Sequence, residues 1–228
     1  MPLVTMPYIQ SQRCNTASPI AAPTIILAKL LIMPKDATTV ESDGRRQRTE
    51  RSRSAIINAA LELIEEGLLI ATAQQIADRA NIGIRTFFRH FEDMGALAQA
   101  VDESIRGQYE AAMLDADRSG TFEERILHAV ERHADVYEQN YNIILATTAQ
   151  RWRLEVLQKN YARVQKGLRK DLDNWLPELK TIASSQREAI DAIASFEMWH
   201  RLREHQGLSV KTCIEIINGL LLKLTQSA

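Results

Sequence analysis

The segment from Thr72 to Phe91 constrains the fold more than any other part of the chain. Apolar residues recur there at helical spacing in two short stretches, residues 73–80 and 84–90, separated by the corner Asn81-Ile82-Gly83. Asn81 stands where the first stretch must end, and asparagine adopts the left-handed conformation more readily than any residue but glycine. Two short helices joined by such a turn form a helix-turn-helix, whose second helix can enter the DNA major groove.

The rest of the chain also follows a helical period. A first helix is predicted from about Glu50 to Glu66, closed by Gly67, and Thr72 is placed to cap the next one. Further helices are expected at about 92–115, 122–140, 188–205 and 210–224, and one or two more at about 145–175. Strand alternation and internal repeats are missing from the sequence, so the predicted fold class is all-α.

Composition divides the chain into three predicted parts. Residues 1–44 hold five of the six prolines and no sustained periodicity, so we expect a mostly disordered extension. Met33 is a candidate natural start, because Met33-Pro-Lys-Asp leads directly into a polar arm. Residues 45–93 form the expected helix-turn-helix domain, and residues 94–228 form a helical domain of their own.

A net charge of −1 excludes any argument from bulk basicity, so a nucleic-acid interface must show its cations locally. Such a cluster exists around the start of the first predicted helix, as a flexible arm or a helix start, and its only acidic neighbour is Glu50. Its members are Arg45, Arg46, Arg48, Arg51 and Arg53.

Two cysteines, Cys14 and Cys213, do not make a disulfide framework, and we expect a reducing cytoplasm. The longest apolar run, Ile25–Met33, contains Lys29 and is shorter than the roughly 20 residues that span a bilayer. It also lacks a convincing small-residue cleavage site of the kind that follows a signal peptide. We therefore expect no association with a membrane.

Three runs of residues have fixed spacings across the first predicted helices. They are Ile57-x-Ala-Ala-x-x-Leu-Ile-x-x-Gly67, then Thr72-x-x-x-Ile-Ala77, then Ala80-Asn-Ile-Gly-Ile-Arg-Thr-Phe-Phe-Arg-His-Phe91, with Leu97 beyond. Together these runs resemble the tetracycline-repressor (TetR) family of bacterial regulators. The resemblance implies an N-terminal three-helix domain that binds DNA and a C-terminal helical domain for dimerisation and ligand binding.

The chain departs from the family's usual residues at several positions near the turn. Asn81 and Gly83 replace the usual Gly and Ser, and Arg85 replaces a Gly and adds a cation. Phe88 lacks the hydroxyl of the usual Tyr, and Met94 lacks the charge of the usual Lys. These changes bear on the operator sequence and on affinity rather than on the fold.

By this resemblance, the DNA contacts come from both short helices and from the arginine cluster. The expected residues are Ile84, Arg85, Thr86, Phe88, Arg89, His90, Thr72, Gln74, Arg45, Arg46 and Arg48. Arg85 and Arg89 are four residues apart and share a helix face, so both can enter one groove and donate to guanine. The alternative is that these two arginines form a solvated face, while Phe87 and Phe91 pack in the core in either case.

The resemblance also implies a homodimer that binds a palindromic operator, and a small-molecule effector that we cannot identify. Apolar stripes at Ile190–Leu202 and Val210–Leu224 suit a dimer interface, although the intramolecular core can consume both. Candidate pocket residues are aromatic or adaptable: Tyr137, Tyr141, Trp152, Trp175, Met198 and Trp199. Candidate polar anchors are His133, Glu131 and Glu197.

An enzyme is disfavoured, and we expect no catalytic residue, metal or cofactor. His128 and His133 are five apart, as are His200 and His205, so each pair lies about 140° apart around a helix. Metal ligands on a helix favour a spacing of four residues. The runner-up is a helical dimer that binds a ligand or a protein and has lost DNA binding. Repression, rather than activation, is expected by analogy alone.

Overall fold

The computed structural model of the chain describes residues 42–114 and 116–226. Residues 1–41, which hold most of the predicted extension together with Cys14 and Met33, lie outside the described residues, as do residues 115 and 227–228. Within the described ranges the regular elements are helices without any strand, so the predicted all-α class is confirmed. Those ranges contain no helix with the length and apolar character needed to cross a bilayer.

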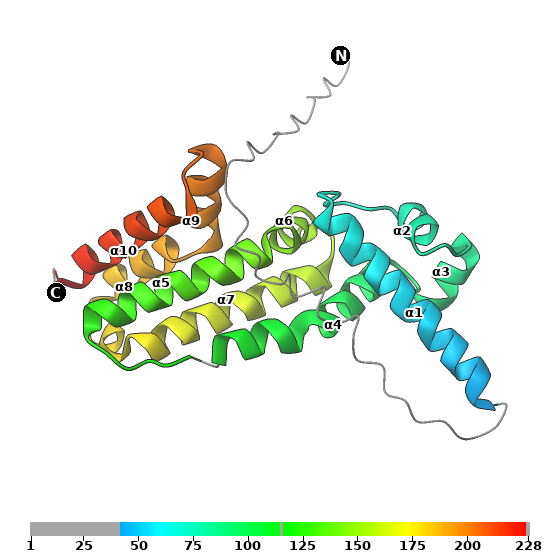
Figure 1. Ribbon diagram of the computed structural model, residues 1–228, viewed down its shortest axis with the longest axis horizontal. Helices are drawn as coiled ribbons and strands as arrows, with labels where there is room; N and C mark the ends of the chain where they lie inside the picture. Colours follow the sequence, from blue (N-terminus) through cyan, green and yellow to red (C-terminus); the bar gives the residue numbers. More distant parts are fainter. Residues whose placement is uncertain (1–41, 115, 227–228) are drawn as a thin grey trace, which may run out of the picture. The chain divides into compact units, whose positions relative to one another are not determined.

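The first helix, α1 (Ser42–Glu65), begins earlier than the periodicity indicated. We expected a start near Glu50 and assigned residues 42–44 to the extension, but these residues are helical (Figure 1). Residues 46–53 contain neither proline nor glycine, and arginine and glutamine are good helix formers, so the helix runs through them. Beyond its end, Gly67 has a φ of 90°, which glycine adopts without strain.

Two short helices, α2 (Ala73–Arg79) and α3 (Ile84–His90), lie where the sequence predicted them. Thr72 caps α2, since its Oγ1 accepts from Gln75 N at 3.2 Å and Gln75 Oε1 accepts from Thr72 N at 2.8 Å. Asn81 has a φ of 54°, so the predicted left-handed corner is confirmed. Ile82 N donates to Ala77 O at 3.0 Å and closes the turn.

One apolar core joins α1, α2 and α3 to the first turns of α4 (Met94–Leu114). Its buried side chains include Ile56, Ile76, Phe87 and Leu97, one from each helix. Burying a large apolar side chain contributes about 1.5–3 kcal/mol, so packing rather than intrinsic propensity holds the short helices in place. Helix α4 lies beyond residue 93 but contributes to this core, so the core extends past the predicted domain boundary. The boundary between residues 93 and 94 stays a prediction.

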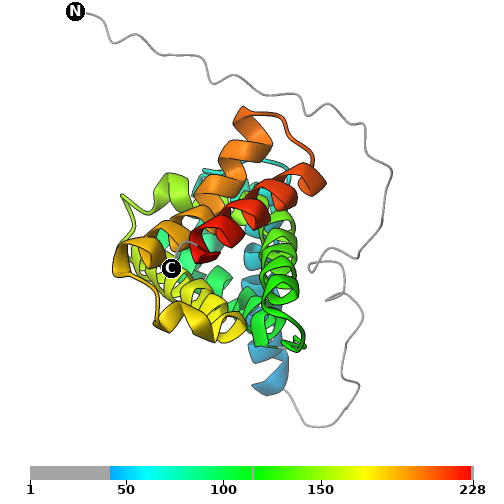
Figure 2. The same cartoon turned by 90° about the vertical axis from the view of Figure 1, so that its left-hand side faces the viewer.

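The remaining helices form a second packed group. In chain order they are α5 (Phe122–Gln139), α6 (Tyr141–Gln150), α7 (Glu155–Trp175), the 3₁₀ turn η2 (Pro177–Lys180), α8 (Ser184–Ile193), α9 (Phe196–His200), the π-helical turn η3 (Arg201–His205) and α10 (Val210–Gln226). Helix α10 packs against α5 and α8, while α7 packs against α4 and α5 (Figure 2). Ile126, Leu172, Trp199 and Leu221 are almost fully buried in the core of this group.

The segment 188–205 is not the single helix that its apolar spacing indicated. Helix α8 ends at Ile193, and Ser195 starts α9. Ser195 Oγ accepts from Met198 N at 3.3 Å and donates to Ala192 O at 2.7 Å. A serine side chain that bonds to nearby backbone competes with the helical ladder, which explains the interruption.

A buried polar cluster links α5 and α7 in the second group. Asp171 accepts hydrogen bonds from Arg118 at 3.0 Å and pairs with His133 Nε2 at 3.1 Å. Burial opposes ionisation of Asp171, but the bonds from His133 and Arg118 outweigh it and lower the pKa of this carboxyl. His133 is therefore engaged within the core, and its role as a ligand anchor stays a prediction.

Candidate nucleic-acid interface and internal cavity

Two buried phenylalanines set the orientation of α3. Phe87 and Phe91 are 0% and 1% exposed, and their ring centroids lie 6.0 Å apart. The guanidinium of Arg53, on α1, lies 4.6 Å from the centroid of the Phe91 ring. These contacts fix the inner face of α3, so Phe88 and Arg89, between the two phenylalanines, project outward.

The exposed face of α3 carries two cations. Arg85 and Arg89 are both exposed and lie one helical turn apart. The described residues give neither guanidinium an ion-pair partner, in contrast to Arg79 on α2, which bonds to Glu66 at 2.7 Å. Arg85 and Arg89 therefore remain available for an external anion or base edge.

The other predicted residues of α3 differ in exposure. Phe88 is 53% exposed, whereas Ile84, Thr86 and His90 are half-buried. His90 Nε2 is buried and meets no hydrogen-bond partner among the described residues. Burial, together with the charges of Arg89 and Arg53, lowers the pKa of His90, so its ring is neutral at pH 7. A DNA contact by His90 stays a prediction, and in this orientation it cannot use Nε2.

The two predicted contacts from α2 already have intramolecular partners. Thr72 Oγ1 takes part in the capping box with Gln75, and Gln74 Nε2 donates to Asp78 Oδ1 at 2.7 Å. A phosphate contact from Gln74 would use the second N–H of its Nε2, whereas one from Thr72 would require it to share its hydroxyl. Their role in DNA binding stays a prediction.

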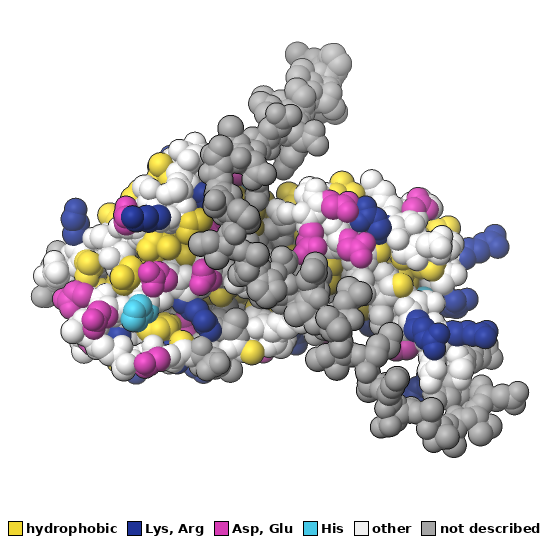
Figure 3. Space-filling view, in the orientation of Figure 1, with side chains coloured by type: hydrophobic (Ala, Val, Ile, Leu, Met, Phe, Trp, Pro, Cys, Tyr) yellow, Lys and Arg dark blue, Asp and Glu magenta, His cyan; other side chains and the backbone are white. Residues whose placement is uncertain are grey.

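The arginine cluster forms the start of α1 rather than a flexible arm. Arg46 and Arg48 are exposed, while the side chain of Arg45 lies outside the described residues. In the space-filling view, dark-blue side chains gather at the right-hand end, over α3 and the beginning of α1 (Figure 3). The cations that the sequence placed in two separate segments thus occur at one end of this helical group.

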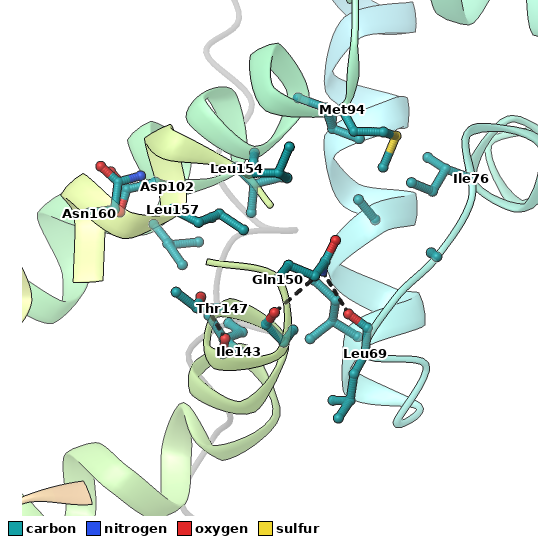
Figure 4. Close-up of a pocket in the computed structure, with 18 residues that line it drawn as sticks. Leu69, Ile76, Met94, Asp102, Ile143, Thr147, Gln150, Leu154, Leu157 and Asn160 are labelled. Atoms are coloured by element: carbon teal, nitrogen blue, oxygen red, sulfur yellow. Dashed lines mark hydrogen bonds between the residues drawn. The ribbon is translucent and has the colours of Figure 1, made fainter. Parts of the chain in front are cut away.

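Cavities that are partly open to solvent occur between α4, α6 and α7, at positions that the sequence did not indicate. One, of about 100 Å³, reaches the N-terminal helices (Figure 4). A second, of about 90 Å³, reaches Tyr137 and Phe196. Among the predicted aromatic candidates, Tyr137 alone lines either cavity in the described part of the chain. Trp175 and Trp199 are core residues, and Trp152 is 80% exposed. Most lining residues are aliphatic, which in a sequence is indistinguishable from ordinary core.

Comparisons with known proteins agree with this architecture. Residues 56–101 match the model of a family described as bacterial regulatory proteins, tetR family. A similar protein is the HTH-type transcriptional regulator TcmR of Streptomyces glaucescens, 37% identical over 78 residues. That match covers 32% of this chain and 34% of TcmR, so about a third of each chain is aligned.

Two solved structures extend the likeness in fold beyond the N-terminal helices. A transcriptional regulator from Rhodococcus sp. Rha1 has a TM-score of 0.56 and 16% identity, covering 77% of this chain and 96% of that one. A candidate transcriptional regulator from Streptomyces coelicolor A3(2) has a TM-score of 0.52 and 17% identity, covering 77% and 98%. Residues 56–101 thus match the tetR family of bacterial regulatory proteins in sequence, and the wider chain shares the fold of these two solved structures.

Proposed function

We propose that this protein is a transcriptional regulator that binds a palindromic DNA operator as a homodimer and represses transcription until an effector binds. The observation that carries the proposal is the outer face of α3, where Arg85 and Arg89 are exposed without described ion-pair partners. A rigid short helix with two cations one turn apart suits the major groove, where arginine donates two bonds to guanine. The site of action is the cytoplasm, where bacterial DNA lies.

The DNA contacts divide into two kinds. Arg85 and Arg89 are the proposed base readers, because they project from the helix that would enter the groove. Arg46 and Arg48, on the first turns of α1, are the proposed phosphate contacts, together with Arg45, Thr72 and Gln74. Phosphate contacts position the protein and act on any sequence, whereas base contacts discriminate between sequences.

A homodimer follows from the size of the interface. One seven-residue helix offers few base contacts, and two copies spaced about 34 Å apart double them by symmetry. Helix α10 supports this part of the proposal. Its inner residues Cys213, Ile217 and Leu221 are buried within the chain, while Leu220 is half-buried and outside the packed core of the described residues. Leu220 therefore leaves apolar surface for a second copy.

A gel-shift titration with the DNA upstream of the protein's own gene, in about 50 mM salt, tests the proposal. Arg89→Ala should weaken operator binding by roughly 5- to 150-fold, since a bidentate arginine–guanine contact contributes roughly 1–3 kcal/mol. Its binding to scrambled DNA should change much less. Arg46→Ala should weaken binding to both DNAs by a similar factor.

Arg201→Ala is the matched control, because it removes an exposed arginine from the C-terminal helices and changes the net charge equally. It should bind the operator as the unaltered protein does. Failure of the unaltered protein to shift the DNA would favour the alternative, a helical dimer that has lost DNA binding. Equal losses on both DNAs for Arg89→Ala would remove this residue from the base readers.

A further inference from the structure

The two cavities between α4, α6 and α7 are neighbouring parts of one elongated space. Both cavities are lined by residues of all three helices, and five residues line both of them. We call the region of these shared residues the waist. These residues are Asp102, Ile105, Ile143, Thr147 and Asn160. The two parts, of about 100 Å³ and about 90 Å³, together exceed the volume of a cavity that accepts one benzene ring, about 150 Å³. The space therefore suits a molecule with two ring-sized parts.

Most polar groups at the waist already have partners. The carboxylate of Asp102 accepts hydrogen bonds from Tyr109 at 2.9 Å and from Arg163 at 2.8 Å, and it also pairs with Arg106. Thr147 Oγ1 donates to Ile143 O at 2.9 Å. Because two arginines compensate Asp102, the waist offers no free charge to a ligand, and an ionised ligand would lose its hydration without gaining a counter-ion.

Asn160 is the exception at the waist. Its Nδ2 is buried, and no hydrogen-bond acceptor meets it among the described residues. A buried donor without an acceptor is unfavourable, and an acceptor on a ligand would remove that cost. Since Asn160 lines both parts of the space, the acceptor must lie between the two ring-sized parts of the ligand.

We propose that the space between α4, α6 and α7 binds an uncharged molecule with two apolar, ring-sized parts joined by a hydrogen-bond acceptor, and that Asn160 Nδ2 donates to this acceptor. The inference deepens the effector part of the proposed function and rests on it only for the consequence at DNA. Binding of the ligand needs no DNA, so this inference and the proposed function can fail independently of each other.

The end of the space that reaches the N-terminal helices explains how a ligand would act on the DNA-binding helices. Ile76 of α2, a buried residue of the N-terminal core, lines it, and so does Gln150 at the end of α6. Gln150 Nε2 donates to Leu69 O at 2.8 Å and thereby attaches α6 to the loop before α2 (Figure 4). A ligand here contacts the residues that hold α2 in place.

The test is calorimetric titration of the full chain, without DNA, with benzophenone and with diphenylmethane. The two compounds have the same two rings, but only benzophenone carries a central carbonyl that accepts a hydrogen bond. We expect benzophenone to bind at least tenfold more tightly. Irradiated benzophenone should then attach to peptides of α4, α6 or α7, as mass spectrometry of a digest would reveal.

Asn160→Leu should bind the two compounds with equal affinity, because it keeps an apolar waist and removes the donor. Asn174→Leu, the same change at an exposed position of α7 outside both cavities, should keep the tenfold preference. The proposal is overturned if the unaltered protein binds neither compound or binds both equally, a result that does not depend on the variants. A preference retained in Asn160→Leu, or labelling confined to other helices, also overturns it.

Discussion

At the scale of single residues, the two adjacent phenylalanines of α3 have opposite environments. Phe87 is 0% exposed and packs among α1, α2 and α4, whereas Phe88 is 53% exposed. Both belong to the same apolar stripe in the sequence, so periodicity alone could not separate them. The helix points one ring into the core and leaves the other at its edge, 5.3 Å away between centroids.

Replacing each phenylalanine with alanine should therefore have very different consequences for stability. Phe87→Ala should lower the free energy of unfolding by about 3–5 kcal/mol, the cost of a large cavity in a core. Phe88→Ala should lower it by about 1 kcal/mol, the worth of one aromatic pair. Urea unfolding followed by circular dichroism measures both, and similar losses for the two variants would contradict the assigned burial.

His90 and Gln74 show how burial and hydrogen bonding affect side chains that the sequence predicts to contact DNA. Residue type and position made both candidates for contact with DNA. In the structure His90 Nε2 is buried, and Gln74 bonds to Asp78 on its own helix. The direction of a side chain depends on its neighbours in space, which a sequence pattern does not contain.

At the scale of elements, the turn between α2 and α3 depends on one backbone conformation. Asn81 has a φ of 54°, and its side chain is exposed. A substitution there changes the backbone preference and few contacts, so its effect on stability is mainly conformational.

Asn81→Gly should leave the free energy of unfolding nearly unchanged, while Asn81→Ala should lower it by about 1–2 kcal/mol, because a Cβ disfavours positive φ. Asn58, exposed in the middle of α1, is the matched control. There alanine should be more stabilising than glycine, since alanine is the better helix former. If the glycine and alanine variants had the same order of stability at both positions in urea unfolding, the left-handed assignment of Asn81 would be refuted.

At the scale of the whole molecule, half-buried residues on α10 make assembly testable. Leu220 should lie against a second copy, so Leu220→Glu should convert a dimer to a monomer by placing a charge in an apolar interface. Gln226→Glu adds the same charge at an exposed site of α10 and should remain a dimer. Size-exclusion chromatography with light scattering distinguishes the two. A monomeric unaltered protein at micromolar concentration would exclude the proposed dimer.

By itself, the sequence determined the helices, the Asn81 corner and the capping role of Thr72, because these depend on local spacing and backbone preference. It also identified Arg85 and Arg89, whose separation of four residues places them on one face of any helix. Tertiary structure alone decided the break at Ser195, the burial of His90 Nε2, and the space around Asn160. Those features arise where separate helices meet, and the distances between such helices are set by packing rather than by neighbours along the chain.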